Sequence, residues 1–311
     1  MDRRRVPLLA LLSETWYERT GVSMAETETY TPETLDEVGA LLLAADGQPC
    51  PLARGTSLII RSQGEPAPIV VALTHVPELN RLEYEERDGL LIGAALPLGG
   101  VLEFPPVRDA YAILADGGRP AGPGEVWARA TFAELLGNGP PAADLVVPLI
   151  CLGASVAVFG PHGWSEMAVE ALCVKREGAG LQPGEFIVDV RLPARAPRSG
   201  GAYVRSDPQG DAMGVGAFLL MQDDLDTCCG ARLTVWLAPG TAFRALDAER
   251  FLRGKRFDDD VVRRAGELIA EAGGPLPNQS DRVEERLHGL REIACQAIHG
   301  ALDRARSHLG G

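Results

Sequence analysis

The chain has 311 residues, of which 46% are hydrophobic and 23% are charged. This composition is typical of a globular protein with one to three compact units and excludes a disordered chain. The formal net charge of −13, from 30 basic and 43 acidic residues, argues against nucleic acid or an anionic membrane as the main partner, because both repel a negative surface.

The first 23 residues are predicted to be an extension ahead of a domain that begins near Met24. Their apolar run, from Val6 to Leu12, contains a proline and is followed at once by two polar residues. Because a cleavage site of small residues is also missing, the segment is not predicted to be a secretory signal. No run in the chain approaches the length of about 20 apolar residues that spans a bilayer. We therefore expect a cytoplasmic protein without a membrane partner.

The next segment, to about residue 98, is predicted to form a small lobe. A helix is expected over residues 32–45, with Thr31 as its cap and Pro32 at its first position. A short strand should lead into the loop at 53–57. Apolar, branched runs at 69–73 and 90–94 predict buried strands of the same lobe.

A second lobe is predicted from about residue 99 to residue 195. Pro105-Pro106 and the stretch 117–124, rich in glycine and proline, indicate loops. Residues 145–152 are apolar and predict a helix. Residues 155–159 and 185–192 predict strands, with a turn at 160–163 after the first of them.

A composition shift at residues 193–201, which read PARAPRSGG, predicts an exposed linker to a separate domain at 200–311. Strands are expected there over 215–221 and 231–238, followed by three helical segments that include 261–272 and 281–307. The last helix has an apolar stripe that favours ordinary core packing. Its length would also suit a subunit interface.

The six cysteines and five histidines show no spacing typical of metal ligands, so no zinc or iron–sulfur site is expected within this chain. The vicinal Cys228-Cys229 could form a redox pair, although two small apolar residues at the start of a strand are the simpler interpretation. No Ser-His-Asp order, H-E-x-x-H or P-loop is present, so no catalytic residue is assigned.

Several short motifs follow one another in a recognisable order. Residues 130–145 read ATFAELLGNGPPAADL, residues 52–58 LARGTSL and residues 71–79 VALTHVPEL, and later segments read LQPGE at 181–185, VRLP at 190–193 and GDAM at 210–213. From about Met24 to Ala305 the chain thereby resembles the FAD-binding (middle, flavoprotein) subunit of molybdenum hydroxylases, a group that includes the xanthine and carbon monoxide dehydrogenases.

The resemblance implies an α+β fold. It predicts a two-lobed PCMH-type FAD-binding module at 24–195, followed by a C-terminal α+β domain like that of carbon monoxide dehydrogenase flavoproteins. In such modules two glycine-rich loops turn backbone N–H groups toward the FAD pyrophosphate. The cofactor-binding positions carried over from the family, with Arg205 as a basic neighbour of the isoalloxazine, are Ala53, Arg54, Gly55, Thr56, Ser57, Leu58, Thr131, Asn138, Ala143, Asp144 and Asp211.

Three residues depart from the pattern of the family. Arg54 replaces the leading glycine of the first loop, and Ala133 and Glu134 replace both glycines of the second. A side chain at a position with positive φ costs on the order of 1 kcal/mol. The carboxylate of Glu134 should repel a diphosphate unless a cation intervenes, and Arg54 could pair either with the pyrophosphate or with Glu134.

Two kinds of function remain open at this point. The resemblance implies an oxidoreductase subunit that relays electrons through FAD, from an iron–sulfur subunit and a molybdopterin subunit, to an acceptor. The altered loops allow a flavin-free paralogue instead, acting as a scaffold or as a repurposed small-molecule-binding or biosynthetic protein.

Overall fold

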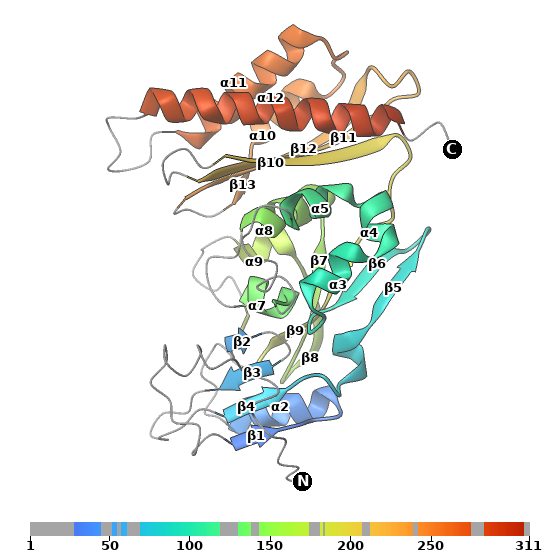
Figure 1. Ribbon diagram of the computed structural model, residues 1–311, viewed down its shortest axis with the longest axis vertical. Coiled ribbons are helices and arrows are strands. Elements are labelled where there is room, and N and C mark those ends of the chain that lie inside the picture. The colour runs from blue at the N-terminus through green and yellow to red at the C-terminus, as the bar shows by residue number, and fades with distance from the viewer. Residues whose placement is uncertain are drawn as a thin grey trace.

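The computed structural model describes residues 28–44, 52–54, 57–60, 69–118, 130–137, 143–173, 181–182, 184–206, 212–238, 242–274 and 283–307. Within these residues the strands form three sheets, which follow one another along the long axis of the molecule (Figure 1). Helices accompany every sheet, and the C-terminal helices lie at the end opposite the first sheet. The expected α+β class is confirmed.

The first sheet has the order β1-β4-β3-β2, with β1 parallel to β4 and the other neighbours antiparallel. Its elements, together with one helix, are β1 (Glu28–Tyr30), α2 (Leu35–Ala44), β2 (Leu52–Arg54), β3 (Ser57–Ile60) and β4 (Ile69–Ala72). The buried side chains of Leu35, Val38 and Leu42 share one face of α2, as the apolar spacing of this segment predicts.

Helix α2 begins three residues later than the sequence predicts. The hydroxyl of Thr34 accepts a hydrogen bond from the backbone N–H of Glu37 at 3.2 Å, and the carboxylate of Glu37 accepts one from the N–H of Glu33 at 2.8 Å. Thr34 therefore caps the helix in place of Thr31, because a threonine with a glutamate three residues later can satisfy the first free N–H groups from both sides.

The second sheet is antiparallel throughout and has the order β5-β6-β9-β7-β8. The 3-10 turn η3 (Pro77–Asn80) leads into it. Its strands are β5 (Leu82–Glu85), β6 (Gly89–Gly93), β7 (Ser155–Gly160), β8 (Gly163–Ala168) and β9 (Phe186–Leu192). The strand predicted at 90–94 pairs with β9 and not with the first sheet. Strands β5 and β6 thus belong to the sheet of the second lobe, so this lobe starts at β5, before the boundary expected near residue 98.

Short helices lie between the strands of the second sheet in sequence: α3 (Leu98–Glu103), α4 (Pro105–Ala110), α5 (Ala112–Gly118), α7 (Phe132–Gly137), α8 (Ala143–Leu152) and α9 (Val169–Cys173). The helix predicted at 145–152 is confirmed as α8. The loop predicted at Pro105-Pro106 is wrong, since these residues open α4. Proline is favoured in the first helical turn, where its missing N–H is not needed.

The C-terminal sheet is antiparallel, in the order β10-β11-β12-β13. Its strands are β10 (Ser199–Ser206), β11 (Met213–Met221), β12 (Cys228–Leu237) and β13 (Phe243–Arg244), and they are followed by α10 (Leu246–Leu252), α11 (Asp259–Gly273) and α12 (Val283–Ser307). Helix α12 packs on β10 and β11, while α5 and α8 pack against the same sheet (Figure 1). The apolar stripe of α12, including Leu290, Ala294 and Ala297, is buried as expected of core.

The predicted linker at 193–201 is exposed only in part, because its last residues belong to β10. Ser199 and Gly200 are both buried. A Cβ at Gly200 would lie 2.1 Å from the backbone oxygen of Ala301. The glycines that suggested a flexible connection therefore allow a close approach between a strand and a helix.

Candidate functional site

The second loop of the motif series begins at Thr131, which is fully buried and forms a β-bridge with Pro97. Its hydroxyl accepts the backbone N–H of Glu134 at 3.3 Å, and its carbonyl accepts the N–H of Leu135 at 3.0 Å. The N–H of Ala133 donates to the carbonyl of Ala94 at 3.0 Å. Thr131 is thus the cap of α7, and the N–H groups of Ala133, Glu134 and Leu135 have partners within the protein.

The residues that replace the glycines of the second loop lie in the first turn of α7. Among the described residues other than glycine, positive φ occurs only at Arg198 and Leu225. Ala133 and Glu134 therefore adopt a backbone that any residue tolerates, and the strain considered from the sequence does not arise there. Ala133 is buried, whereas Glu134 is only half-buried.

The first loop connects β2 and β3, which pair antiparallel with Arg54 opposite Ser57. Arg54 ends strand β2, and an extended backbone requires no glycine at this position. Helix α7 contacts β2, so the structure brings the two altered loops together.

Much of the first loop lies outside the described residues. Gly55 and Thr56 do so entirely, as do the side chains of Ala53, Arg54, Ser57 and Leu58. The proposed pairing of Arg54 with Glu134 remains a prediction for this reason. Asn138, Asp211 and the side chain of Ala143 also lie outside the described part of the chain.

Asp144, in the first turn of α8, is buried and joins the module to the C-terminal sheet. The hydroxyl of Tyr203 donates to its Oδ1 at 2.6 Å, and Nη1 of Arg205 donates to its Oδ2 at 2.6 Å. Burial, followed by the negative charge of Asp144, raises the pKa of Tyr203 well above its usual range, so its hydroxyl stays a donor. Two predicted site residues, Asp144 and Arg205, thus meet each other directly.

A second carboxylate reinforces this junction. Asp116 in α5 accepts from Nη2 of Arg304 in α12 at 2.9 Å and from the backbone N–H of Tyr203 at 3.2 Å. Arg304 also donates to the carbonyl of Gly201 at 2.6 Å. Asp116, Tyr203 and Arg304 were missed from the sequence, because no local spacing connects residues that are 87 and 188 positions apart.

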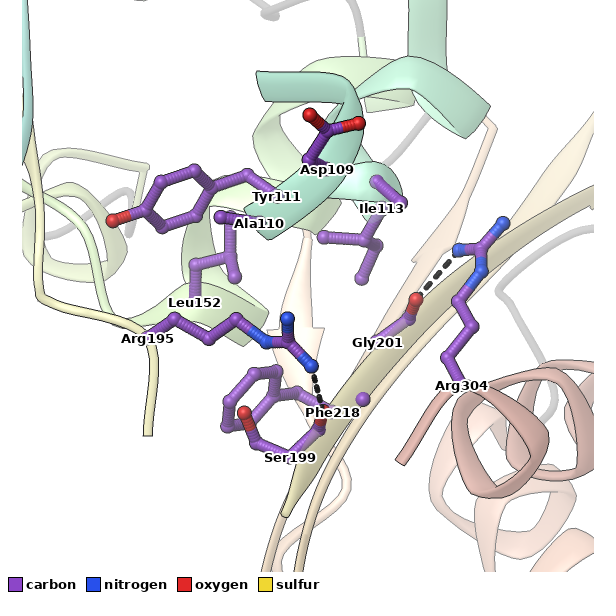
Figure 2. A pocket seen from close by; sticks show the side chains of 12 residues that line it. Asp109, Ala110, Tyr111, Ile113, Leu152, Arg195, Ser199, Gly201, Phe218 and Arg304 are labelled. Atoms are coloured by element: carbon purple, nitrogen blue, oxygen red, sulfur yellow. Dashed lines mark hydrogen bonds between the residues drawn. The ribbon is translucent and has the colours of Figure 1, made fainter. Parts of the chain in front are cut away.

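A small cavity opens beside this junction, between α4–α5 and β10 (Figure 2). Its volume of about 20 Å³ is enough for a water molecule and far below that of a dinucleotide. Arg195 reaches into it and donates to the carbonyl of Ser199 at 3.3 Å. The cavity is separate from the two altered loops and is not the candidate cofactor site.

The vicinal cysteines differ in exposure, since Cys228 is buried at the start of β12 and Cys229 is exposed. Cys151 and Cys228 are buried, and burial raises the pKa of their thiols to about 12 and about 11. Across the described ranges no group of three or more histidine, cysteine or acidic side chains could hold a metal ion. In the same ranges, no helix is both long and apolar enough to cross a membrane.

Comparison with known proteins identifies the family. The family described as the FAD binding domain in molybdopterin dehydrogenase matches residues 24–195. This match covers more than half of the chain, and the protein belongs to that family. The resemblance read from the ordered motifs is thereby confirmed.

The relatives span nearly the whole chain. The 6-hydroxypseudooxynicotine dehydrogenase complex subunit alpha of Paenarthrobacter nicotinovorans is 26% identical over 273 residues, covering 86% of this chain and 92% of the relative. The carbon monoxide dehydrogenase medium chain of Hydrogenophaga pseudoflava is 24% identical over 280 residues, covering 89% and 97%.

Solved structures show the same fold. Carbon monoxide dehydrogenase from Hydrogenophaga pseudoflava has a TM-score of 0.75 at 21% identity, covering 90% of this chain and 98% of that chain. Quinoline 2-oxidoreductase from Pseudomonas putida 86 has a TM-score of 0.72 at 23% identity, covering 89% and 97%. The expected architecture, a two-lobed module followed by a C-terminal α+β domain, is confirmed.

In the second loop, the backbone N–H groups of Ala133 and Glu134 at the start of α7 already have acceptors within the chain. Ala133 introduces no positive-φ strain. Glu134, however, places an acidic residue in that same first turn, where the family has glycine.

Proposed function

We propose that this chain is the flavoprotein subunit of a molybdenum hydroxylase-type dehydrogenase and that it relays electrons. The match of residues 24–195 to the FAD binding domain of molybdopterin dehydrogenases carries the proposal. The similarity to a subunit of a dehydrogenase complex and to a medium chain of carbon monoxide dehydrogenase supports it, because it extends over nearly the full length of those relatives.

We propose that the first loop and Thr131 hold the cofactor, with Gly55, Thr56 and Ser57 next to the pyrophosphate. Bound FAD would supply a centre that can take up electrons singly or in pairs and pass them to an acceptor. Asp144 and Arg205 bond the C-terminal sheet to the module. Asn138, Ala143 and Asp211 remain proposed contacts on the strength of their motif positions.

The proposed partners are an iron–sulfur subunit and a molybdopterin subunit. The relatives named above are themselves components of multi-chain enzymes by their names, and a relay functions only over short distances. We place the substrate of such a complex on a partner chain, since no catalytic motif occurs in this sequence.

We further propose a division of the chain into an extension at 1–23, a module at 24–195 and a C-terminal domain at 200–311. The separate C-terminal sheet and its own apolar core of strand and helix residues support this division. The junction of Asp144, Tyr203 and Arg205 joins the two parts.

A second candidate is a flavin-free paralogue that serves as a scaffold or binds another small molecule. One observation favours it: the N–H groups of Ala133 and Glu134 already have acceptors within the chain. Such a protein would keep the fold and the partners of the family without carrying electrons.

Size-exclusion chromatography of a native cell extract tests the proposed assembly. We expect the chain to elute with larger chains in a fraction that contains iron and molybdenum. Elution as a lone 33.1 kDa species without either metal would contradict the subunit proposal.

A further inference from the structure

We propose that the small cavity beside β10 binds a monatomic anion of chloride size, held by the guanidinium of Arg195. The cavity lies where α4 and α5 of the module meet strand β10 of the C-terminal sheet (Figure 2). A bound anion would therefore contact both parts of the chain. This site is independent of the flavin and of the two altered loops.

Arg195 is a half-buried cation without a counter-charge. It lies in the segment between β9 and β10, and its guanidinium donates to the carbonyl of Ser199 at 3.3 Å. Burial lowers the pKa of Arg195, and no carboxylate among the described residues pairs with it. The group still stays charged at neutral pH. Since a guanidinium has five N–H donors, one neutral acceptor leaves most of them for water or an anion.

The other charged side chains of the cavity do not cancel this charge. Arg304 forms an ion pair with Asp116 and donates to the carbonyl of Gly201 at 2.6 Å, so this pair is neutral as a whole. Asp109 is exposed, and its carboxylate points away from Arg195 (Figure 2). The exposed position of Asp109 in the lining also shows that the cavity reaches the surface, where an ion can enter.

The outer edge of β10 adds a second hydrogen-bond donor. The carbonyl of Arg198 accepts from the N–H of Met221 at 3.0 Å, and bonded residues alternate along an antiparallel pair. Ser199 and Gly201 therefore turn their backbone groups away from β11, and their carbonyls accept from two arginine side chains instead. The N–H of Gly201 points to the same side and has no acceptor among the described residues.

The size of the cavity selects the kind of anion. Its volume of about 20 Å³ suffices for one water molecule or for a monatomic ion of similar size. Ile113, Leu152 and Phe218 contribute apolar walls, which leave no room for a polyatomic anion such as methanesulfonate. Because little water surrounds an ion in such a place, its attraction to the guanidinium is screened less than at the open surface.

The test is the chloride dependence of the stability of the purified full chain. Urea unfolding is compared in sodium chloride and in sodium methanesulfonate at equal ionic strength, so that general screening is the same in both. An anion that binds only the folded state shifts the unfolding equilibrium. With a site half filled at about 20 mM, chloride at about 200 mM should raise the folding equilibrium constant about tenfold over methanesulfonate.

Two variants and one crystal measurement assign this effect to the cavity. Arg195→Gln removes the charge and should abolish the difference between the two salts. Arg108→Gln, which neutralises an exposed arginine of α4, is the matched control and should keep the difference. Crystals of the parent grown in bromide need no variant, and anomalous scattering should locate a bromide ion in contact with the guanidinium of Arg195.

Equal unfolding of the parent in the two salts, or a difference that Arg195→Gln retains, would overturn the proposal. Crystals in which the cavity holds only water at high bromide concentration would overturn it as well. A bromide ion there without any chloride-dependent stability would be an adventitious ion only and would also contradict the proposal. Each of these results leaves the subunit proposal standing, because that proposal is tested by flavin binding and by assembly.

Discussion

The residue that most clearly organises this molecule is Asp144. Both of its carboxylate oxygens are bonded to β10, one to Tyr203 and the other to Arg205. A buried carboxylate is stable only when its partners replace the lost water, and these two partners do so. The motif predicted Asp144 and Arg205 as site residues, but no pattern in the sequence predicted that they bond to each other.

Removal of the charge of Asp144 should weaken the whole fold. In Asp144→Asn the ion pair between Asp144 and the partly buried Arg205 is lost, and we expect the free energy of unfolding to fall by about 2–4 kcal/mol. Urea denaturation measures this change. Asp223→Asn is the control, since the ion pair of Asp223 with Arg198 is solvent-exposed and should contribute less than about 1 kcal/mol. A loss as small as that of the control would show that the junction is not held by this pair.

At the scale of elements, the sequence predicts helices and strands best where buried apolar residues recur at regular spacing or in long runs. Helices α8 and α12 and the strands of long apolar runs are predicted within a few residues. Strand β8 was missed because it is an edge strand with mostly exposed side chains, and polar residues on both faces hide the alternation. Strand β10 was missed because its glycines suggested a linker.

The close packing of strand β10 against helix α12 can be tested at Gly200. We expect Gly200→Ala to lower the free energy of unfolding by about 3 kcal/mol, because the new Cβ meets a backbone oxygen that cannot rotate away. Gly100→Ala is the matched substitution at an exposed position of helix α3, where nothing lies within 4 Å of the new Cβ. It should stabilise the protein by roughly 0.5–1 kcal/mol. Thermal or urea unfolding of the two variants should give opposite signs, and equal effects would contradict the packing argument.

The β11–β12 hairpin should be sensitive to acid. Hydrogen bonds from Arg306 and then Arg256 lower the pKa of Asp226. A lowered pKa in the folded state contributes stability above the unfolded value of about 3.9, and this contribution is lost as pH falls through the folded pKa. The thermal midpoint of the parent should thus exceed that of Asp226→Asn near neutral pH and approach it below about pH 4.

Arg306→Gln removes the first partner of Asp226 and should show the same pattern. A constant difference between parent and Asp226→Asn from pH 7 to pH 3 would contradict the assignment.

At the scale of the whole molecule, the C-terminal sheet is packed on both faces. Helices α10, α11 and α12 form one core with it, and α5 and α8 of the module lie against its other side (Figure 1). A Cβ at Gly216 in β11 would meet Val147 and Cys151 of α8 at 2.7 Å. The module and the C-terminal domain are therefore fitted to each other.

Separation of the two parts should expose this fitted surface. We expect residues 24–195, produced alone, to bind a hydrophobic dye and to self-associate in size-exclusion chromatography, because the buried face of α8 loses its cover. The full chain is the control. A monodisperse module without dye binding would show that the interface contributes little to folding.

Equilibrium titration of the purified full-length protein with FAD, followed by chromatographic identification of the flavin retained, shows whether this chain carries a flavin. If it is the flavoprotein subunit, we expect saturable binding of one FAD per chain. No retained flavin and no saturable binding would contradict that assignment and favour the flavin-free alternative.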